Sequence, residues 1–395
     1  MDYNHRYFLE LLSAALNQEN PAKPTEMVDW ETIYRESIAH EVHPLIYTVV
    51  KKLGLPSTGV FDSFSRAVLF AVTRQAQYLD EVKRVLKELN LSDIHFIALK
   101  GLMHRKYYPQ AELRTMGDFD LLVRPEQLGS VGVVLDRCGY VRMSEDAKHQ
   151  VFIKPNCAQI EIHHSLFTQE DFIDPPNYTE LSWQNAVKEE IDGVSILVQG
   201  PEDLLAYSIL HAAKHFKKAG IGLRQLCDLF YLLKTPGPNF DTDYFNQLLA
   251  GGKCTRFFDA LQDICILYFH AKADRPTDQN TADEVLEVIL AGGIYGRKTG
   301  QAALGNALGG KLTPSEAASL STPVKLKRML TAYLFPPRDK LAKRYAYAIK
   351  KPILLPIAWC HRFTRFLSTT KLSFSLFRAP GQAAKKMSLM EKLDM

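Results

Sequence analysis

The sequence predicts an α+β protein in which a mixed-sheet unit is flanked by helical regions on both sides along the chain. Residues 1–90 place apolar side chains at the i, i+3, i+4, i+7 spacing of amphipathic helices. Near residue 93 the period becomes that of short strands, and from Pro201 the helical period returns. These changes predict an N-terminal helical region (1–90), an α/β unit (91–200), a helical domain (201–320) and a basic, aromatic C-terminal segment (321–395).

Composition places the chain among ordinary globular proteins. It has 395 residues, of which 46% are hydrophobic and 23% charged, and this length suits two or three structural units. Six scattered cysteines without a Cys-x-x-Cys pair argue against a disulfide framework and favour a reducing cytosol. There is no signal-peptide pattern at the start and no run of about 18 uncharged apolar residues. We therefore expect a cytoplasmic protein without a membrane span.

Within the α/β unit, two short apolar runs read as strands: "IHFIAL" (94–99) and "DFDLLV" (118–123). A helix is expected between Pro125 and Gly139, since proline is favoured near helix starts and glycine at helix ends. The runs 150–155 and 158–167 alternate in polarity and predict a hairpin around the turn "PNCA".

Two aspartates at the start of the second strand stand out. Side chains alternate along a strand, so Asp118 and Asp120 share one face with Cα atoms about 6.6 Å apart. Two carboxylates on a half-buried surface repel each other unless a cation lies between them, and Mg²⁺ takes such oxygen ligands. Glu161 alternates with isoleucines on a later strand and would join them if the two strands were neighbours. The alternative is a solvated strand edge.

The Lys100-Gly101 pair ends the first strand and opens a helical stretch. Gly101 would let the backbone approach a phosphate, and Lys100 would reach a phosphate oxygen as a point charge. A plain turn is the alternative. Arg114 reads equally well as a phosphate clamp or as a counter-ion to the two aspartates.

Other polar residues leave alternatives open. Of His163 and His164, one shares the face of Glu161 and either orients an acceptor or simply marks a strand end. His211 and His215 are spaced i, i+4, but no third zinc ligand is evident, so they are expected to line a cleft. Arg224 either contacts a base or phosphate or pairs with Asp228 one helical turn on.

Positive charge gathers near the C-terminus. Residues 325–386 contain fifteen lysines and arginines, interleaved with aromatic residues, against one acidic residue, Asp339. This pattern fits a nucleic-acid surface or an amphipathic helix lying peripherally on anionic lipid. A solvated face packed on the rest of the protein is the third interpretation.

Taken together, "LKG", "RTMGDFDLLV" and "IEIH" resemble the polymerase-β-like nucleotidyltransferase superfamily, and most closely a family of uncharacterised bacterial nucleotidyltransferases. The resemblance covers about residues 90–235 and implies that superfamily's mixed-sheet fold. It implies Asp118, Asp120 and Glu161 as catalytic, metal-binding carboxylates. It also implies that Lys100 and Gly101 hold the triphosphate, and we place Arg114, His211 and Arg224 on the nucleotide as well. Leu102 stands where the superfamily usually has a second glycine or a serine.

The implied reaction is nucleotidyl transfer. An acceptor hydroxyl would attack the α-phosphate of an NTP such as ATP, pyrophosphate would leave, and Mg²⁺, or alternatively Mn²⁺, would neutralise charge. The resemblance places the third acid near the attacking hydroxyl, so Glu161 would help to activate it. The acceptor is left open among a small molecule, a protein and an RNA. The alternatives are a catalytically silent binding protein, which has no reason to keep three converging carboxylates, and a toxin-like transferase acting on RNA.

Overall fold

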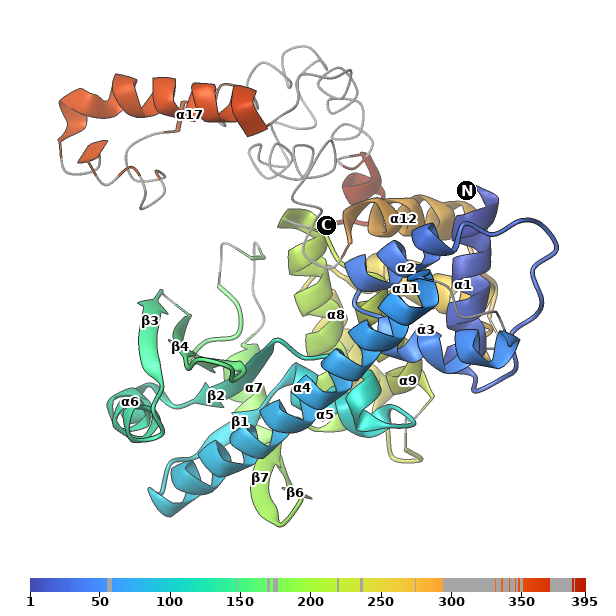
Figure 1. The fold of residues 1–395 in the computed structure, drawn as a ribbon. Coiled ribbons are helices and arrows are strands. Elements are labelled where there is room, and N and C mark those ends of the chain that lie inside the picture. The colour runs from blue at the N-terminus through green and yellow to red at the C-terminus, as the bar shows by residue number, and fades with distance from the viewer. Residues whose placement is uncertain are drawn as a thin grey trace. The chain divides into compact units, whose positions relative to one another are not determined.

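The protein is described here from a computed structural model. It covers residues 1–54, 59–146, 148–168, 171–172, 177–218, 220–234, 237–273, 275–293, 331, 335–336, 341, 345, 347–348, 351–369, 386 and 388–395. The chain forms two compact units: Met1–Ala212 with Leu223–Asp283, and Ala213–Gly222 with Glu284–Met395. The first unit holds the β-sheet, whose strands are labelled in Figure 1, and the predicted site residues Lys100, Gly101, Arg114, Asp118, Asp120, Glu161, His211 and Arg224.

One mixed sheet lies at the centre of the first unit. Among the described residues it has seven strands in the order β3-β4-β5-β2-β1-β7-β6. Strand β2 pairs antiparallel with β1 and parallel with β5, while β1 pairs parallel with β7. The predicted α+β fold class is therefore confirmed. The strands are β1 (Phe96–Ala98), β2 (Asp118–Val123), β3 (Val141–Glu145), β4 (His149–Ile153), β5 (Gln159–His163), β6 (Val187–Ile191) and β7 (Val194–Val198).

Helices precede and follow the sheet along the chain, as the change of hydrophobic period predicts. The N-terminal helices are α1 (Tyr3–Leu16), α2 (Trp30–Ala39), α3 (His43–Val50) and α4 (Gly59–Leu91). Short helices α5 (Lys100–His104), α6 (Leu128–Arg137) and α7 (Tyr178–Gln184) connect strands. After the sheet come α8 (Pro201–Lys218), α9 (Leu223–Leu233), α10 (Thr242–Gly251), α11 (Thr255–Phe269) and α12 (Gln279–Gly292).

Helix α4 runs beside the sheet as a long rod (Figure 1). Its buried residues recur at helical spacing, so one stripe of the helix supplies its core contacts: Tyr78, Val82, Val85, Leu86 and Leu89. Its Gln75 donates to the Met116 carbonyl at 3.0 Å and accepts from the Met116 backbone N–H at 2.9 Å. Both groups of Met116 are satisfied in this way, and the backbone is fixed two residues before β2 begins.

Within the second unit, the structure describes helix α17 (Leu355–Thr369). A small apolar cluster of Leu341, Tyr345, Ala348 and Ala358 packs beside it. Much of the basic segment 325–386, and the whole run 294–330, lie outside the described residues. In the part of the chain that the structure describes, no helix is both long and apolar enough to cross a membrane.

The strand predictions hold where alternation was strong. Strand β2 begins and ends where expected, and β4 and β5 form the expected antiparallel hairpin. Strands β3, β6 and β7 were not predicted. The β6–β7 hairpin had a readable signal, because Asp192 and Gly193 both adopt positive φ at its turn and Asp-Gly is a favoured hairpin dipeptide.

Candidate active site

The parallel pairing of β2 with β5 brings the carboxylates together. Asp120 lies directly opposite Glu161, and Asp118 lies opposite Gln159. Neighbouring strands are about 4.8 Å apart, so the carboxylates of Asp120 and Glu161 occupy one surface of the sheet. Asp120 is only 4% exposed, while Asp118 and Glu161 are half-buried. The expectation that Glu161 joins the aspartates through strand pairing is thus confirmed.

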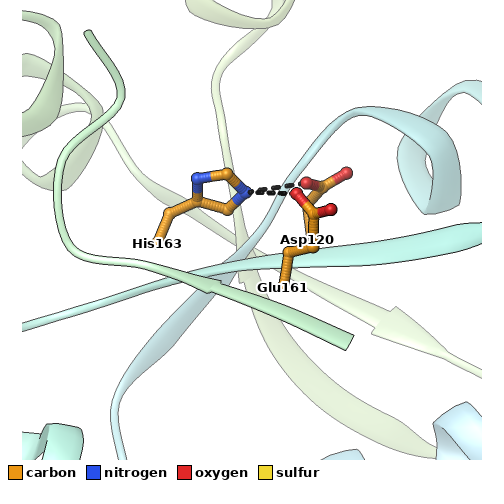
Figure 2. Close-up of side chains that lie close together, drawn as sticks. All are labelled: Asp120, Glu161 and His163. Carbon is orange, nitrogen blue, oxygen red and sulfur yellow. Dashed lines mark hydrogen bonds and ion pairs between the residues drawn. The ribbon is translucent and has the colours of Figure 1, made fainter. Parts of the chain in front are cut away.

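A histidine stands between the two opposed carboxylates. His163 Nε2 lies 2.7 Å from Asp120 Oδ1 and 3.5 Å from Glu161 Oε2, and Figure 2 shows this ring nitrogen facing both groups. His163 follows Glu161 by two residues on β5 and so shares its face. Its ring stacks on His149 with centroids 5.1 Å apart. Of the two alternatives for this histidine, the structure favours a place in the site over a bare strand end.

Lys100 also reaches Asp120, from the turn after β1. Its Nζ lies 3.1 Å from Asp120 Oδ1 and 5.8 Å from the ring centroid of Tyr207 on α8. Lys100 has a φ of +36°, which is uncommon for a residue with a side chain, so this turn carries strain. Leu102, which replaces the usual small residue, is buried and only 5% exposed. It therefore contributes to the core.

Arg114 is buried and pairs with Asp228 of α9. Its Nε and Nη2 lie 3.2 and 2.8 Å from the two carboxylate oxygens of Asp228, a bidentate ion pair. A Cβ added to Gly101 would lie 2.8 Å from Arg114 Nη1, so the glycine is what allows this close approach. Arg114 is a structural counter-ion, as one interpretation held, but its carboxylate is Asp228 and not the aspartates of β2.

Arg224 also fixes the backbone that leads into β2. It forms an ion pair with Glu41 and donates from Nη1 to the Thr115 carbonyl at 3.1 Å. One of the two interpretations paired Arg224 with Asp228, but in the structure Arg224 makes these contacts and Asp228 pairs with Arg114. His211 contacts the other neighbour of Lys100, Tyr207: the centroids of the His211 and Tyr207 rings are 5.9 Å apart.

The pKa values of the two aspartates shift in opposite directions. Burial raises the pKa of Asp118, and the neighbouring Asp120 carboxylate raises it further. Burial acts the same way on Asp120, but Lys100 and the hydrogen bond from His163 outweigh it and hold that pKa below its usual range. For Lys100 and His163 burial opposes the charged form, yet the carboxylates prevail and raise both pKa values.

Comparison with known proteins identifies the family. Residues 26–270, well over half of the chain, match the family described as uncharacterised nucleotidyltransferases. The chain belongs to this family. None of the curated proteins compared with it gives a significant match.

Solved structures of nucleotidyltransferases show only distant likeness to this family member. The solution structure of the antibiotic-resistance factor ANT(2″)-Ia is 13% identical, with a TM-score of 0.34 over 48% of this chain and 96% of that one. The crystal structure of ANT(2″)-Ia with adenylyl-2″-tobramycin is 12% identical, with a TM-score of 0.33 over 44% and 94%. An antigenic nucleotidyltransferase-like protein from Paracoccidioides brasiliensis is 15% identical, with a TM-score of 0.32 over 50% and 95%. These values are too low to support a functional argument.

A divalent metal fits the donor set of this nucleotidyltransferase. One ligand atom each from Asp120, Glu161 and His163 lies within 4.8 Å of the others. Asp118 lies on the same face of β2 but is not part of this group, so its role as a metal ligand stays a prediction. Divalent cations bind closely spaced carboxylate oxygens of this kind.

Sequence reasoning missed Tyr207 and Gln75, and it considered Asp228 only as a partner of Arg224. Tyr207 and Asp228 come from helices α8 and α9, and their sequence surroundings read as ordinary amphipathic helix. Gln75 on α4 gave no signal at all. His163 was noticed because it shares the strand face of Glu161, and the same alternation could have placed it among the metal-binding candidates.

Proposed function

We propose that this protein transfers an NMP group from an NTP to an acceptor hydroxyl by a divalent-metal-dependent, in-line displacement. The observation that carries the proposal is the parallel β2–β5 pairing, which sets Asp120 opposite Glu161 with Asp118 on the same face. Two opposed carboxylates with a third on the same strand face, beside Lys100, suit the arrangement that such chemistry needs. Family membership supports the transferase class.

In the proposed step, the acceptor oxygen forms a bond to the α-phosphorus while the bond from that phosphorus to the bridging oxygen breaks. Pyrophosphate leaves with the bonding electron pair. Glu161, the least enclosed of the two opposed carboxylates, accepts the hydroxyl proton. Asp118, Asp120 and Glu161 would hold Mg²⁺ or Mn²⁺, which when bound neutralises charge on the phosphates.

The nucleotide is proposed to bind at the turn after β1. Lys100 already lies beside Asp120 and carries a charge that the carboxylate keeps in place, so it is positioned to meet a phosphate next to the metal ligands. Gly101 packs closely against Arg114, so its contact with the triphosphate stays a prediction. Direct nucleotide contact by Arg114, His211 and Arg224 stays a prediction, and the buried ion pairs of the two arginines support a role in holding the turn.

The acceptor class is left open, and the cytoplasmic location and ATP as the nucleotide also stay predictions. The same holds for the contact of residues 325–386 with an anionic membrane or nucleic acid, and for the four-part domain division. The silent-scaffold and RNA-toxin alternatives are tested by the same experiment as the main proposal.

The test is label transfer. The full chain is incubated with each α-labelled NTP, Mg²⁺ or Mn²⁺, and a cell extract, beside the isosteric variants Asp118→Asn, Asp120→Asn and Glu161→Gln. Asp136→Asn, an exposed acid on α6, is the matched control. We expect labelled product with the wild type and the control, and a loss of at least about 100-fold in the three variants, because each removes a charge that the transition state needs. Equal labelling by all five proteins would contradict the proposal.

The size class of the labelled product then separates small-molecule, protein and RNA acceptors. Metal-dependent NTP binding without any transfer, with every extract and NTP, would favour the silent binding protein instead.

A further inference from the structure

We propose that His163 Nε2 is itself a metal ligand in this nucleotidyltransferase, and that this imidazole makes the site prefer Mn²⁺ over Mg²⁺. The inference rests on the proposed function, which places a divalent ion at Asp120 and Glu161. It goes beyond that function because a site of carboxylates alone would give no reason for such a preference.

Two of the three distances between the donor atoms are close to those between neighbouring ligands of one ion, and all three donor atoms lie within 4.8 Å of one another. His163 Nε2 lies 2.7 Å from Asp120 Oδ1 and 3.5 Å from Glu161 Oε2. Two ligands at right angles on an ion, each about 2.1 Å from it, are about 3.0 Å apart. The observed distances lie on either side of this value, so small side-chain shifts would seat an ion between the three groups.

The imidazole is also held in the orientation that a ligand needs. The His163 residue is only 8% exposed, and its ring stacks on His149 at an interplanar angle of 24°. Figure 2 shows Nε2 turned toward both carboxylates. Because strand β5 and the stacked ring fix the side chain, little conformational entropy is lost when a metal binds.

The donor chemistry then decides which metal is favoured. Mg²⁺ is a hard ion that binds oxygen at near-ideal octahedral positions, and it gains little from an imidazole. First-row transition ions accept nitrogen more readily, and Mn²⁺ among them also suits carboxylate oxygen. Two carboxylates with one imidazole therefore favour Mn²⁺. The competing explanation is that His163 only donates a hydrogen bond that holds the carboxylates apart.

The experiment measures metal binding by the full chain without nucleotide. Free Mn²⁺ is followed by electron paramagnetic resonance during titration, and Mg²⁺ by competition. The variants are His163→Asn, which offers oxygen in place of nitrogen, and His163→Phe, which offers no ligand. The matched control is His95→Gln, whose side chain is 71% exposed. Asp120→Asn reports on the site as a whole.

We expect Mn²⁺ affinity to fall at least about tenfold in both His163 variants, and Mg²⁺ affinity to change less than about threefold in His163→Asn. The control should bind both metals like the wild type. The wild type alone gives a second readout that does not depend on any variant folding. Pulsed resonance of its bound Mn²⁺ should show coupling to an imidazole ¹⁴N nucleus, and this coupling should persist in His149→Gln and vanish in His163→Asn.

Absence of ¹⁴N coupling in the wild type, or its loss in His149→Gln but not in His163→Asn, would overturn the inference. Unchanged Mn²⁺ affinity in both His163 variants, with binding lost in Asp120→Asn, would do the same and leave the proposed function standing. If Asp120→Asn also bound both metals like the wild type, the proposed function would fail as well.

Discussion

Asp228 is expected to be one of the most sensitive positions in the first unit. Its carboxylate is 3% exposed and accepts from Arg114 Nε and Nη2 and from the Tyr108 hydroxyl at 2.8 Å, while His104 Nδ1 lies 3.2 Å away. Three partners from residues 104–114, the segment between the Lys100 turn and β2, thus meet on one residue of α9. Asp228→Ala would leave the Arg114 guanidinium buried without its counter-charge.

The expected loss of stability follows from the burial of the Arg114–Asp228 ion pair. Arg114 is 6% exposed, and removing one partner of a buried ion pair costs about 3–5 kcal/mol because the other charge is left uncompensated. The Tyr108 hydroxyl would lose its acceptor as well, at about 1–3 kcal/mol. We therefore expect Asp228→Ala to lower the free energy of unfolding by at least about 3 kcal/mol. Asp136→Ala, which removes an exposed acid on α6, should stay within about 0.5 kcal/mol of the wild type.

The assay is urea unfolding of the full chain followed by circular dichroism, read at the transition of the unit that contains both residues. A double-mutant cycle adds Arg114→Met and the pair Arg114→Met/Asp228→Ala. Because both charges are gone in the double variant, it should be more stable than Asp228→Ala. The reasoning is refuted if Asp228→Ala costs less than about 1 kcal/mol, or if the two single effects simply add.

Three further predictions follow from individual contacts. Gly101→Ala should destabilise the fold by about 1–3 kcal/mol, because its Cβ would meet Arg114 Nη1 at 2.8 Å; thermal unfolding measures this, and an unchanged Tm would contradict it. Lys100→Met should raise the pKa of Asp120, because burial is then opposed by His163 alone; carboxyl NMR titration measures the shift, and an unchanged pKa would be the adverse result. Burial lowers the pKa of His43 to about 4 from 6.5. The unfolded chain therefore binds the extra proton first, and stability should be full above about pH 6.5 and decline toward pH 4. The urea unfolding midpoints measured at the two ends of this pH range should differ less in His43→Gln than in the wild type. An equal difference in the two proteins would contradict the prediction that His43 causes the loss of stability.

The acidic residues of the candidate site could be predicted from the sequence more fully than the residues that hold them in position. Side-chain alternation along a strand placed Asp118 and Asp120 on one face and Glu161 on the face opposite its isoleucines, and the structure confirms that the two strands are neighbours. The N-terminal helices were equally readable, since their apolar spacing is regular. In each case a local pattern was enough.

What could not be predicted depends on contacts far apart in the chain. Arg114 and Asp228 are separated by 114 residues, and nothing near either one indicates its partner. The same is true of Gln75 and Met116, which lie 41 residues apart. Strands β3 and β6 are short, with most of their side chains exposed, so their alternation is weak. Pairing with a neighbouring strand, and not local propensity, makes these segments strands.

The central claim is most directly tested by comparing the fate of two labels in one acceptor assay. The wild type is supplied in parallel with α-labelled and γ-labelled NTP, using the nucleotide and extract fraction that give product, with Asp120→Asn as the inactive reference. Nucleotidyl transfer predicts that the α-label alone enters the acceptor, that the γ-label is released as pyrophosphate, and that Asp120→Asn transfers neither. Transfer of the γ-label to the acceptor, or equal α-label transfer by Asp120→Asn, would contradict the account.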